Sequence, residues 1–352
     1  MKFLQTASLA WALASFVGGC RVTAAAPWPD APDLHGLGAA LEPSLRQYHV
    51  PTVAIAVVDH GKIVLDTVLT DNKSAVPSDT RFEAASLSKP VFATAVVQLA
   101  RQRVLDLDTP IARYLPWPEL HDSRASSITA RMILSHTSGA PNVVKTGDAR
   151  LEFDPGSRWR YSGAAYIHLQ RVVEHLTGEP LERVVAQRVF APLDMRQSSF
   201  VDASAPTYGE AVGHDRQGHA LPRDRFLHAS AAFSLRTTAG DYARFLAAML
   251  GTNDDGPLDA VNRRTLLSPQ IVVDSVLSLR WALGWALAPA TFFHWGSNPG
   301  FKSFVMGDPT RGRGFVMLTD GDNGLELAPI AARVIMNRNY DWFRFYMLHP
   351  ND

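Results

Sequence analysis

The sequence contains a single cysteine, Cys20, among 352 residues. One thiol this close to the N-terminus leaves the rest of the chain without an internal disulfide, a cysteine nucleophile or a cysteine-rich metal site. Acidic and basic residues are equally numerous, 34 of each, so the chain lacks the positive charge that nucleic-acid-binding proteins carry. Beyond residue 26 no apolar run is long enough to cross a bilayer. We therefore expect no nucleic-acid partner and no membrane span in the mature chain.

Two widespread hydrolase signatures are also missing. The sequence has no His-Glu-x-x-His, the motif of zinc peptidases, and no Gly-x-Ser-x-Gly, the motif of α/β-hydrolases. His214, Asp215 and His219 lie close together, but their glycine-rich, polar surroundings favour a surface hairpin over a metal site. We expect neither a metal ion nor another cofactor.

The N-terminus has the pattern of an export signal. A basic start precedes an apolar run over residues 3–19. Residues 17–20 resemble a lipobox, in which Cys20 would be lipidated and would attach the protein to a membrane. The alternative is cleavage after the small residues near 24–26, which would remove Cys20. We expect a signal peptide over 1–26 and a periplasmic or cell-envelope location.

Strand patterns lie near both ends of the chain, and helix patterns lie between them. The strands are expected over 53–58, 63–69, 281–287, 292–295, 301–306 and 314–319. The helices are expected over 37–48, from about 86, and over 128–135, 164–176, 181–190, 239–250 and 325–336. This order predicts an α+β fold with one antiparallel sheet, built from both chain ends and flanked by helices, and a mostly helical inserted lobe. We place a tether at 27–35, one domain at 36–340 and a C-terminal tail at 341–352.

Ser86 and Lys89 are the leading candidates for catalysis. Pro90 is tolerated only in the first turn of a helix, so a helix is expected to begin near Ser86 or Leu87. Ser86 would then lie at the positive end of the helix dipole, with Lys89 one turn further on the same face. Such a pair suits a nucleophile and its base; the alternative is an N-cap serine followed by a solvated lysine. The apolar run after Lys89 favours catalysis, because burial eases the loss of a lysine proton.

Six short motifs follow one another in order along the chain. They are Ser86-x-x-Lys89, His136-Thr137-Ser138-Gly139, Asp154-Pro155-Gly156, Tyr161-Ser162-Gly163, Pro192-Leu193-Asp194-Met195 and His294-Trp295-Gly296. Together they resemble the serine β-lactamase-related hydrolases, the group that includes class C β-lactamases, DD-peptidases, D-aminopeptidases and related esterases. The resemblance extends from about residue 35 to residue 338, and it implies the β-lactamase/transpeptidase-like fold.

The resemblance implies a role for each motif. Ser86 would be the acylated nucleophile, and Lys89 and Tyr161 would share the proton transfers as general base and acid. The backbone N–H groups of Ser86 and Ser297 would form the oxyanion hole. The substrate-binding residues implied by the same motifs are Gly163, His294, Trp295 and Gly296. Taken alone, Tyr161 would more often be a packing tyrosine, and His294 a hydrogen-bonded strand histidine. His136 we interpret as a structural turn residue.

Two motifs depart from the β-lactamase pattern. Gly163 stands where those enzymes usually carry an asparagine that contacts the substrate amide, and His294-Trp295-Gly296 replaces Lys-Thr-Gly. Both changes remove polar contacts with a β-lactam, and Trp295 would make the cleft narrower or more apolar. We therefore expect an ester or small amide as substrate.

Three functions stay open at this point. The first is an exported serine hydrolase that cleaves an ester or small amide. The second is a class C-like β-lactamase or penicillin-binding DD-peptidase, which takes a β-lactam. The third is a non-catalytic cell-envelope binding or sensor domain, which the intact set of Ser86, Lys89 and Tyr161 disfavours. The sequence makes no prediction of the oligomeric state.

Overall fold

The computed structural model describes residues 32–71, 76–144, 149–200, 209–222, 228–251 and 256–349. The predicted signal peptide, Cys20 and most of the predicted tether lie outside these residues. Helix α1 (Leu34–Gln47) begins within the last residues assigned to the tether, with Asp33 as its N-cap.

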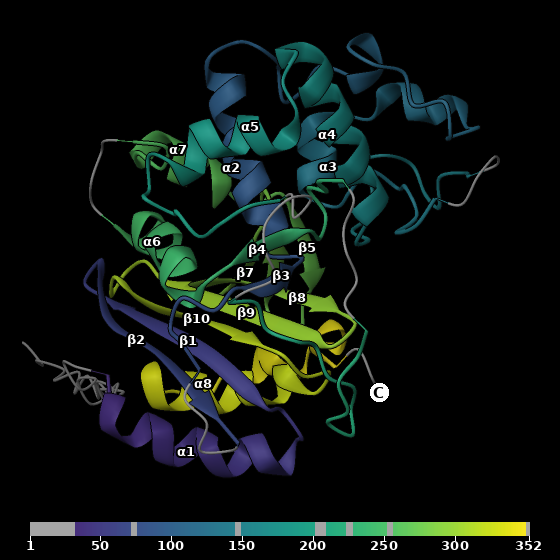
Figure 1. Ribbon diagram of the computed structural model, residues 1–352. Helices are drawn as coiled ribbons and strands as arrows, with labels where there is room; N and C mark the ends of the chain where they lie inside the picture. Colours follow the sequence, from purple (N-terminus) through teal and green to yellow (C-terminus); the bar gives the residue numbers. More distant parts are fainter. Residues whose placement is uncertain are drawn as a thin grey trace, which may run out of the picture. The chain divides into compact units, whose positions relative to one another are not determined.

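An eight-stranded antiparallel sheet lies at the centre of the fold (Figure 1). Its strands, in spatial order, are β2 (Lys62–Thr70), β1 (Thr52–Asp59), β10 (Arg313–Thr319), β9 (Phe301–Asp308), β8 (Thr291–Asn298), β7 (Ala286–Ala288), β6 (Leu279–Trp281) and β5 (Ile271–Asp274). Val53 of β1 lies opposite Thr319 of β10, so the two ends of the chain pair directly. The α+β fold with a sheet assembled from both ends is confirmed.

One predicted strand is wrong in detail. The segment 281–287 forms two short strands, β6 and β7, because Gly284 turns the chain with a φ of 80°. The turn is closed by the Ala282 N–H, which donates to the carbonyl oxygen of Trp285 at 2.8 Å. A positive φ favours glycine, and an apolar run by itself does not reveal such a turn.

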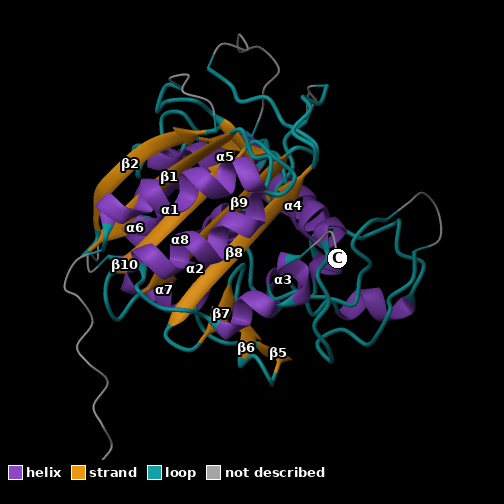
Figure 2. Cartoon of the chain, turned by 90° about the horizontal axis from the view of Figure 1, so that it is seen from below, coloured by secondary structure: helices purple, strands orange, loops and turns teal. Residues whose placement is uncertain are grey.

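Helices cover both faces of the sheet. Helices α1 and α8 (Ala328–Ile335) pack on one face, which is the near face in Figure 2. Helices α2 (Ser88–Arg101) and α6 (Ala239–Leu250) contribute to the core on the opposite face. Because both faces are covered, β9 and β10 are buried along their whole length, and each has an apolar run at its centre, over 304–306 and 315–318.

The inserted lobe lies above the second face. Its helical elements are η1 (Ile111–Arg113), η2 (Ser123–Ser127), α3 (Ala130–Leu134), α4 (Gly163–Thr177), α5 (Leu181–Val185), η3 (Ala186–Phe190) and α7 (Ala260–Leu266). A separate two-stranded sheet joins β3 (Phe82–Ala85) to β4 (Leu235–Thr237). Thr238 caps α6, since its Oγ1 accepts from the Asp241 N–H at 3.1 Å.

The C-terminal segment packs against the sheet. After η4 (Gly324–Leu327) and α8, the chain forms two short turns, η5 (Asp341–Arg344) and η6 (Tyr346–Leu348). The Trp342 ring stacks on Phe293 of β8, with ring centroids 4.1 Å apart, and Phe345 contacts Trp295. The residues that the sequence placed in a tail thus bring aromatic side chains to β8, because these rings bury a large apolar area.

The loop that contains His214 is a hairpin, as predicted. His214 bridges to Ala220, and the Gly218 N–H donates to the Asp215 carbonyl at 3.0 Å. Within the described ranges, no three His, Cys, Asp or Glu side chains are grouped to hold a metal ion. Nor is any described helix both long and apolar enough to cross a membrane.

Candidate active site

Ser86 lies in a tight turn between β3 and α2. Ala85, just before it, has a φ of +49°, and a β-bulge interrupts the pairing of β3 with β4. Helix α2 begins at Ser88, slightly later than predicted. The Ser88 hydroxyl donates to the Ala85 carbonyl at 2.6 Å and accepts from the Leu235 N–H at 3.0 Å. A left-handed, non-glycine residue next to a candidate nucleophile is the kind of strained backbone found at active sites.

Lys89 lies directly beneath Ser86. Its side chain is 1% exposed, and Nζ donates to Ser86 Oγ at 3.1 Å and to the Ala232 carbonyl at 2.7 Å. Burial lowers the pKa of Lys89 from 10.5 to about 7. A lysine with that pKa exchanges protons near neutral pH and contacts the serine it would deprotonate.

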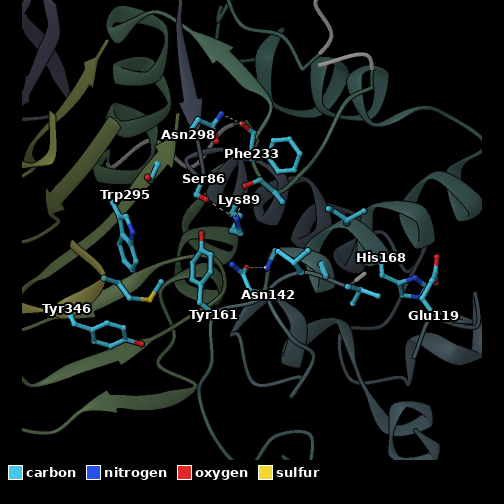
Figure 3. A pocket seen from close by; sticks show the side chains of 18 of the residues that line it. Ser86, Lys89, Glu119, Asn142, Tyr161, His168, Phe233, Trp295, Asn298 and Tyr346 are labelled. Carbon is cyan, nitrogen blue, oxygen red and sulfur yellow. Dashed lines mark hydrogen bonds between the residues drawn. The ribbon is translucent and has the colours of Figure 1, made fainter. Parts of the chain in front are cut away.

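The Tyr161 hydroxyl points toward Ser86 (Figure 3). Lys89 Nζ lies 4.7 Å from the centre of the Tyr161 ring. Burial raises the pKa of the Tyr161 hydroxyl, and a hydrogen bond with Ser86 opposes that rise in part. Tyr161 is therefore protonated at neutral pH and is suited to donate a proton.

His136 holds the backbone around Tyr161. Its Nδ1 accepts from the Ser162 N–H at 3.2 Å, and its carbonyl accepts from the Arg160 N–H at 2.8 Å. The ring is fully buried, 4.2 Å from the Tyr161 ring between centroids. Burial and the neighbouring Lys89 hold the pKa of His136 well below its usual value, so the ring is neutral and can accept. This agrees with the structural role expected of the His-Thr-Ser-Gly motif.

The edge of β8 next to Ser86 carries the second predicted oxyanion donor. Strand β7 pairs only with residues 291–293, so 294–298 have β9 on one side and no paired strand on the other. A Cβ placed on Gly296 would lie 2.9 Å from the Ser86 nitrogen and 2.5 Å from the Ala84 carbonyl oxygen. Glycine at this position thus allows β8 to approach the turn that carries the candidate nucleophile Ser86, hereafter the nucleophile turn. Ser297 follows directly, is exposed, and lines the same cavity as Ser86.

His294 and Trp295 have different surroundings. Trp295 lines the cavity and lies 6.0 Å from Tyr161 between ring centroids. His294 is fully buried behind Tyr161 and does not line the cavity; its Nδ1 accepts from the Trp295 N–H at 2.8 Å. Burial, together with the charge of Lys89, lowers the pKa of His294 to about 3.

Asn142 is a site residue that the sequence analysis missed. Its Oδ1 accepts from the Gly163 N–H at 2.7 Å, and its carbonyl accepts from the Ala164 N–H at 2.9 Å. A Cβ on Gly163 would lie 3.2 Å from that Oδ1, so Asn142 occupies space beside position 163. Because Oδ1 is bonded to Gly163, the side-chain NH₂ is available at the cavity wall (Figure 3). An Asn soon after a Gly-Ala-Pro turn is the only sequence signal for it.

A cavity of about 1010 Å³ connects these groups. Its lining comes from the lobe, the nucleophile turn, β8 and the C-terminal segment. The lining residues outside the predicted set include Trp117, Glu119, Asn142, Ile167, His168, Arg171, Arg344, Tyr346 and Met347. Among the predicted residues, Ser86, Lys89, Tyr161, Gly163, Trp295 and Ser297 line it, whereas His294 and Gly296 lie behind its wall.

Comparison with known proteins identifies the family. The family model described as Beta-lactamase matches residues 37–339. The chain belongs to the beta-lactamase family. Members of this family with named activities are serine hydrolases, and so is this protein.

Individual proteins that are similar to this chain have named activities. The chain is 29% identical to Esterase EstB of Burkholderia gladioli over 320 residues, covering 78% of this chain and 80% of the esterase. Its fold is similar to D-alanine carboxypeptidase AmpC of Burkholderia cenocepacia, with a TM-score of 0.74, 22% identity, and coverage of 86% and 98%. It is also similar to a D-stereospecific amidohydrolase from Streptomyces sp., with a TM-score of 0.73, 19% identity, and coverage of 87% and 100%.

Proposed function

We propose that this family member hydrolyses an ester or a small amide through an acyl-enzyme on Ser86. The observation that carries the proposal is the 3.1 Å contact between Ser86 Oγ and the buried amine of Lys89, whose pKa is about 7. A neutral amine at this distance can accept the hydroxyl proton as the oxygen attacks the substrate carbonyl.

The proton follows a short path. Lys89 takes it from Ser86, and the N–H groups of Ser86 and Ser297 stabilise the negative charge on the carbonyl oxygen. Tyr161 gives its own proton to the leaving group and regains one from Lys89, 4.7 Å from its ring. Water then attacks the acyl-enzyme; the same groups take a proton from this water and give it to Ser86 Oγ as the acid product leaves.

The surroundings of Ser86 favour an ester over a β-lactam. Gly163 brings no side chain to the cavity, and Trp295 presents an indole ring where Lys-Thr-Gly enzymes carry a threonine. Similarity to an esterase supports the same choice. An apolar wall suits an alkyl or aryl ester better than a charged bicyclic lactam.

A specific observation favours a second candidate, a β-lactamase or DD-peptidase. Asn142 supplies a carboxamide beside Gly163, which can contact the amide of a lactam or peptide. Arg344, also at the cavity wall, can pair with a substrate carboxylate.

Intact mass spectrometry after mixing with benzylpenicillin separates the candidates. No adduct, together with phosphonate labelling that Ser86→Ala abolishes, supports the esterase. A lasting adduct on Ser86 supports a penicillin-binding peptidase, and an adduct that clears as drug is consumed supports a β-lactamase. Phosphonate labelling that persists in Ser86→Ala would overturn the acyl-enzyme on Ser86.

We also propose that the protein is exported to the periplasm or cell envelope. The basic and apolar pattern of residues 1–26 supports this. The mass of the N-terminal peptide of the mature protein distinguishes a lipid-anchored from a soluble exported protein. A diacylglyceryl group on Cys20 supports lipidation, and an N-terminus near 27 supports soluble export. An unprocessed chain in the cytoplasm contradicts both.

A further inference from the structure

One end of the cavity is not used by the chemistry at Ser86. Figure 3 shows Glu119 and His168 at this end, well separated from Trp295 and Tyr346 at the other, with Ser86 between them. Beyond Gly163, the residues of α4 that line the cavity are Ala164, Ile167, His168 and Arg171. Their spacing of three and four residues defines one helix face, which runs from beside the nucleophile toward this end.

His168 is buried there, and one of its ring nitrogens has no hydrogen-bond partner among the described residues. The residue is 1% exposed; one ring nitrogen makes a weak hydrogen bond to the Leu115 backbone carbonyl, and the other has no partner in the described part of the chain. Its ring stacks on Trp117, with centroids 4.4 Å apart and planes 6° apart, so its orientation is held. Burial lowers the pKa of His168 to about 4, partly offset by the Leu115 carbonyl, so the imidazole is neutral. A neutral imidazole has one donor and one acceptor, so with its N–H directed at Leu115 it leaves one acceptor nitrogen for a ligand.

Glu119 adds a second unused polar atom. Its Oε1 accepts from Arg171 Nη1 at 2.6 Å, whereas its Oε2 is buried with no partner in the described part of the chain. The carboxylate and the guanidinium balance each other's charge. Buried polar atoms without partners are costly, so a pair of them in one cavity wall indicates a ligand group that satisfies them.

The wall between Ser86 and this end is apolar. Ile167 and Val143 line it, and Val143 is 66% exposed although it is a large hydrophobic side chain. His168 lies five residues after Gly163 in α4, a distance of about 8 Å along the helix axis. A substrate that reaches both ends would therefore have a short apolar spacer.

We propose that Trp117, Glu119 and His168 form a distal subsite, which binds an uncharged hydrogen-bonding head group, a carboxamide, at the remote end of the substrate. This inference rests on the proposed function for the reacting bond at Ser86. The head group donates to Glu119 Oε2 and to the free nitrogen of the His168 imidazole, while its apolar spacer lies along Ile167.

Matched ester series test the proposal. One series has p-nitrophenyl esters of linear acids that end in a carboxamide or in the isosteric isopropyl group. The spacers between the ester and this end group are both shorter and longer than about 8 Å. A second series carries the same ends on the alcohol of acetate esters, because the subsite can serve either side of the scissile bond. At one spacer length in one series, we expect kcat/KM to be about tenfold higher for the carboxamide.

Variants assign that preference to the subsite. In His168→Phe and Glu119→Leu we expect the ratio of carboxamide to isopropyl to fall to about one. His175→Phe, an exposed position two turns along α4, and Glu179→Leu, which removes a surface ion pair with Arg183, are matched controls that keep the ratio. Phosphonate labelling of Ser86 reports that each variant is folded.

Two results would overturn the subsite. One is the absence of any carboxamide preference in both series while p-nitrophenyl acetate is hydrolysed; the other is a preference that survives His168→Phe. Failure of the wild-type protein to hydrolyse any ester or to label on Ser86 would instead overturn the proposed function.

Discussion

Lys89 Nζ donates to the backbone carbonyl of Ala232 at 2.7 Å, and this second partner of the lysine is neutral. A carboxylate in its place would stabilise the ammonium and hold the pKa of Lys89 high. Here burial alone accounts for the shift to about 7. The pairing with Ala232 thus fixes the amine under Ser86 without preventing it from losing its proton.

The rate of acylation should follow the deprotonation of Lys89. Below pH 7 the amine is protonated and cannot accept the Ser86 proton, so the rate should fall about tenfold per pH unit. Above pH 7 it should level off, since Tyr161 keeps its proton there. The second-order rate of phosphonate labelling from pH 5 to pH 9 measures this (about two units on each side of the pKa). A flat profile over that range would contradict the assignment of Lys89 as base.

Lys89 should also make stability depend on pH. Its pKa is about 7 in the folded protein and 10.5 in a free lysine, so between these values the unfolded chain holds a proton that the folded chain does not. Burial of Lys89 therefore destabilises the wild-type protein most at pH 7, and the free energy of unfolding increases as the pH rises over that window. We expect the melting temperature of Lys89→Met relative to wild type to be highest at pH 7 and to decline toward pH 10. An equal difference at both ends would show that the lysine is not desolvated. Ester hydrolysis by this variant should be lost about 10²–10⁴-fold.

Gly296→Ala should disrupt the oxyanion hole. The new Cβ would lie 2.3 Å from Ser303 Oγ and 2.9 Å from the Ser86 nitrogen, so β8 and the nucleophile turn must separate. Displacing one oxyanion donor lowers kcat by about 10²–10³-fold. Gly38→Ala in α1 is the control, because its nearest neighbour would be 3.8 Å away. Steady-state kinetics measure the effect, and wild-type kcat in Gly296→Ala would refute the close approach.

His136 should position Tyr161 through one hydrogen bond. His136→Phe removes the acceptor for the Ser162 N–H and leaves a buried donor unpaired, at a cost of about 1–3 kcal/mol. His136→Asn retains an acceptor and tolerates the φ of 57° at this position. When the two variants are equally stable, we expect His136→Asn to keep a larger fraction of the wild-type kcat than His136→Phe. If both variants lose the same fraction of kcat, the hydrogen bond has no positioning role.

Asn142→Asp should separate amide from ester substrates. The aspartate keeps an acceptor for the Gly163 N–H but loses the NH₂ group at the cavity wall. We expect acylation by benzylpenicillin or a peptide amide to fall by about tenfold more than hydrolysis of p-nitrophenyl acetate. An equal loss for both would mean that Asn142 supports the wall and does not contact the substrate amide.

Much of the site was predictable because its residues lie in short local patterns. The spacing of Ser86 and Lys89 needs only one helical turn, and Pro90 marks where that turn begins. Tyr161 and Gly163 were predicted from the motif set, and both line the cavity with Ser86. Asn142 was missed because its contact with Gly163 joins positions 21 residues apart across a turn. The segment after residue 340 was set aside as a tail because its packing partner, Phe293, is distant in sequence.

The sequence by itself determined that strands lie near both chain ends with helices between them, that a helix begins just after Ser86, and that this helix is apolar enough to bury Lys89. These follow from periodicity and from proline and glycine chemistry, which act between near neighbours. Only the tertiary structure decided which face of β8 reaches Ser86, that His294 lies behind Tyr161, and that Glu119 and His168 share one end of the cavity. Such relationships depend on contacts between distant segments, and those contacts exist only once the core has packed.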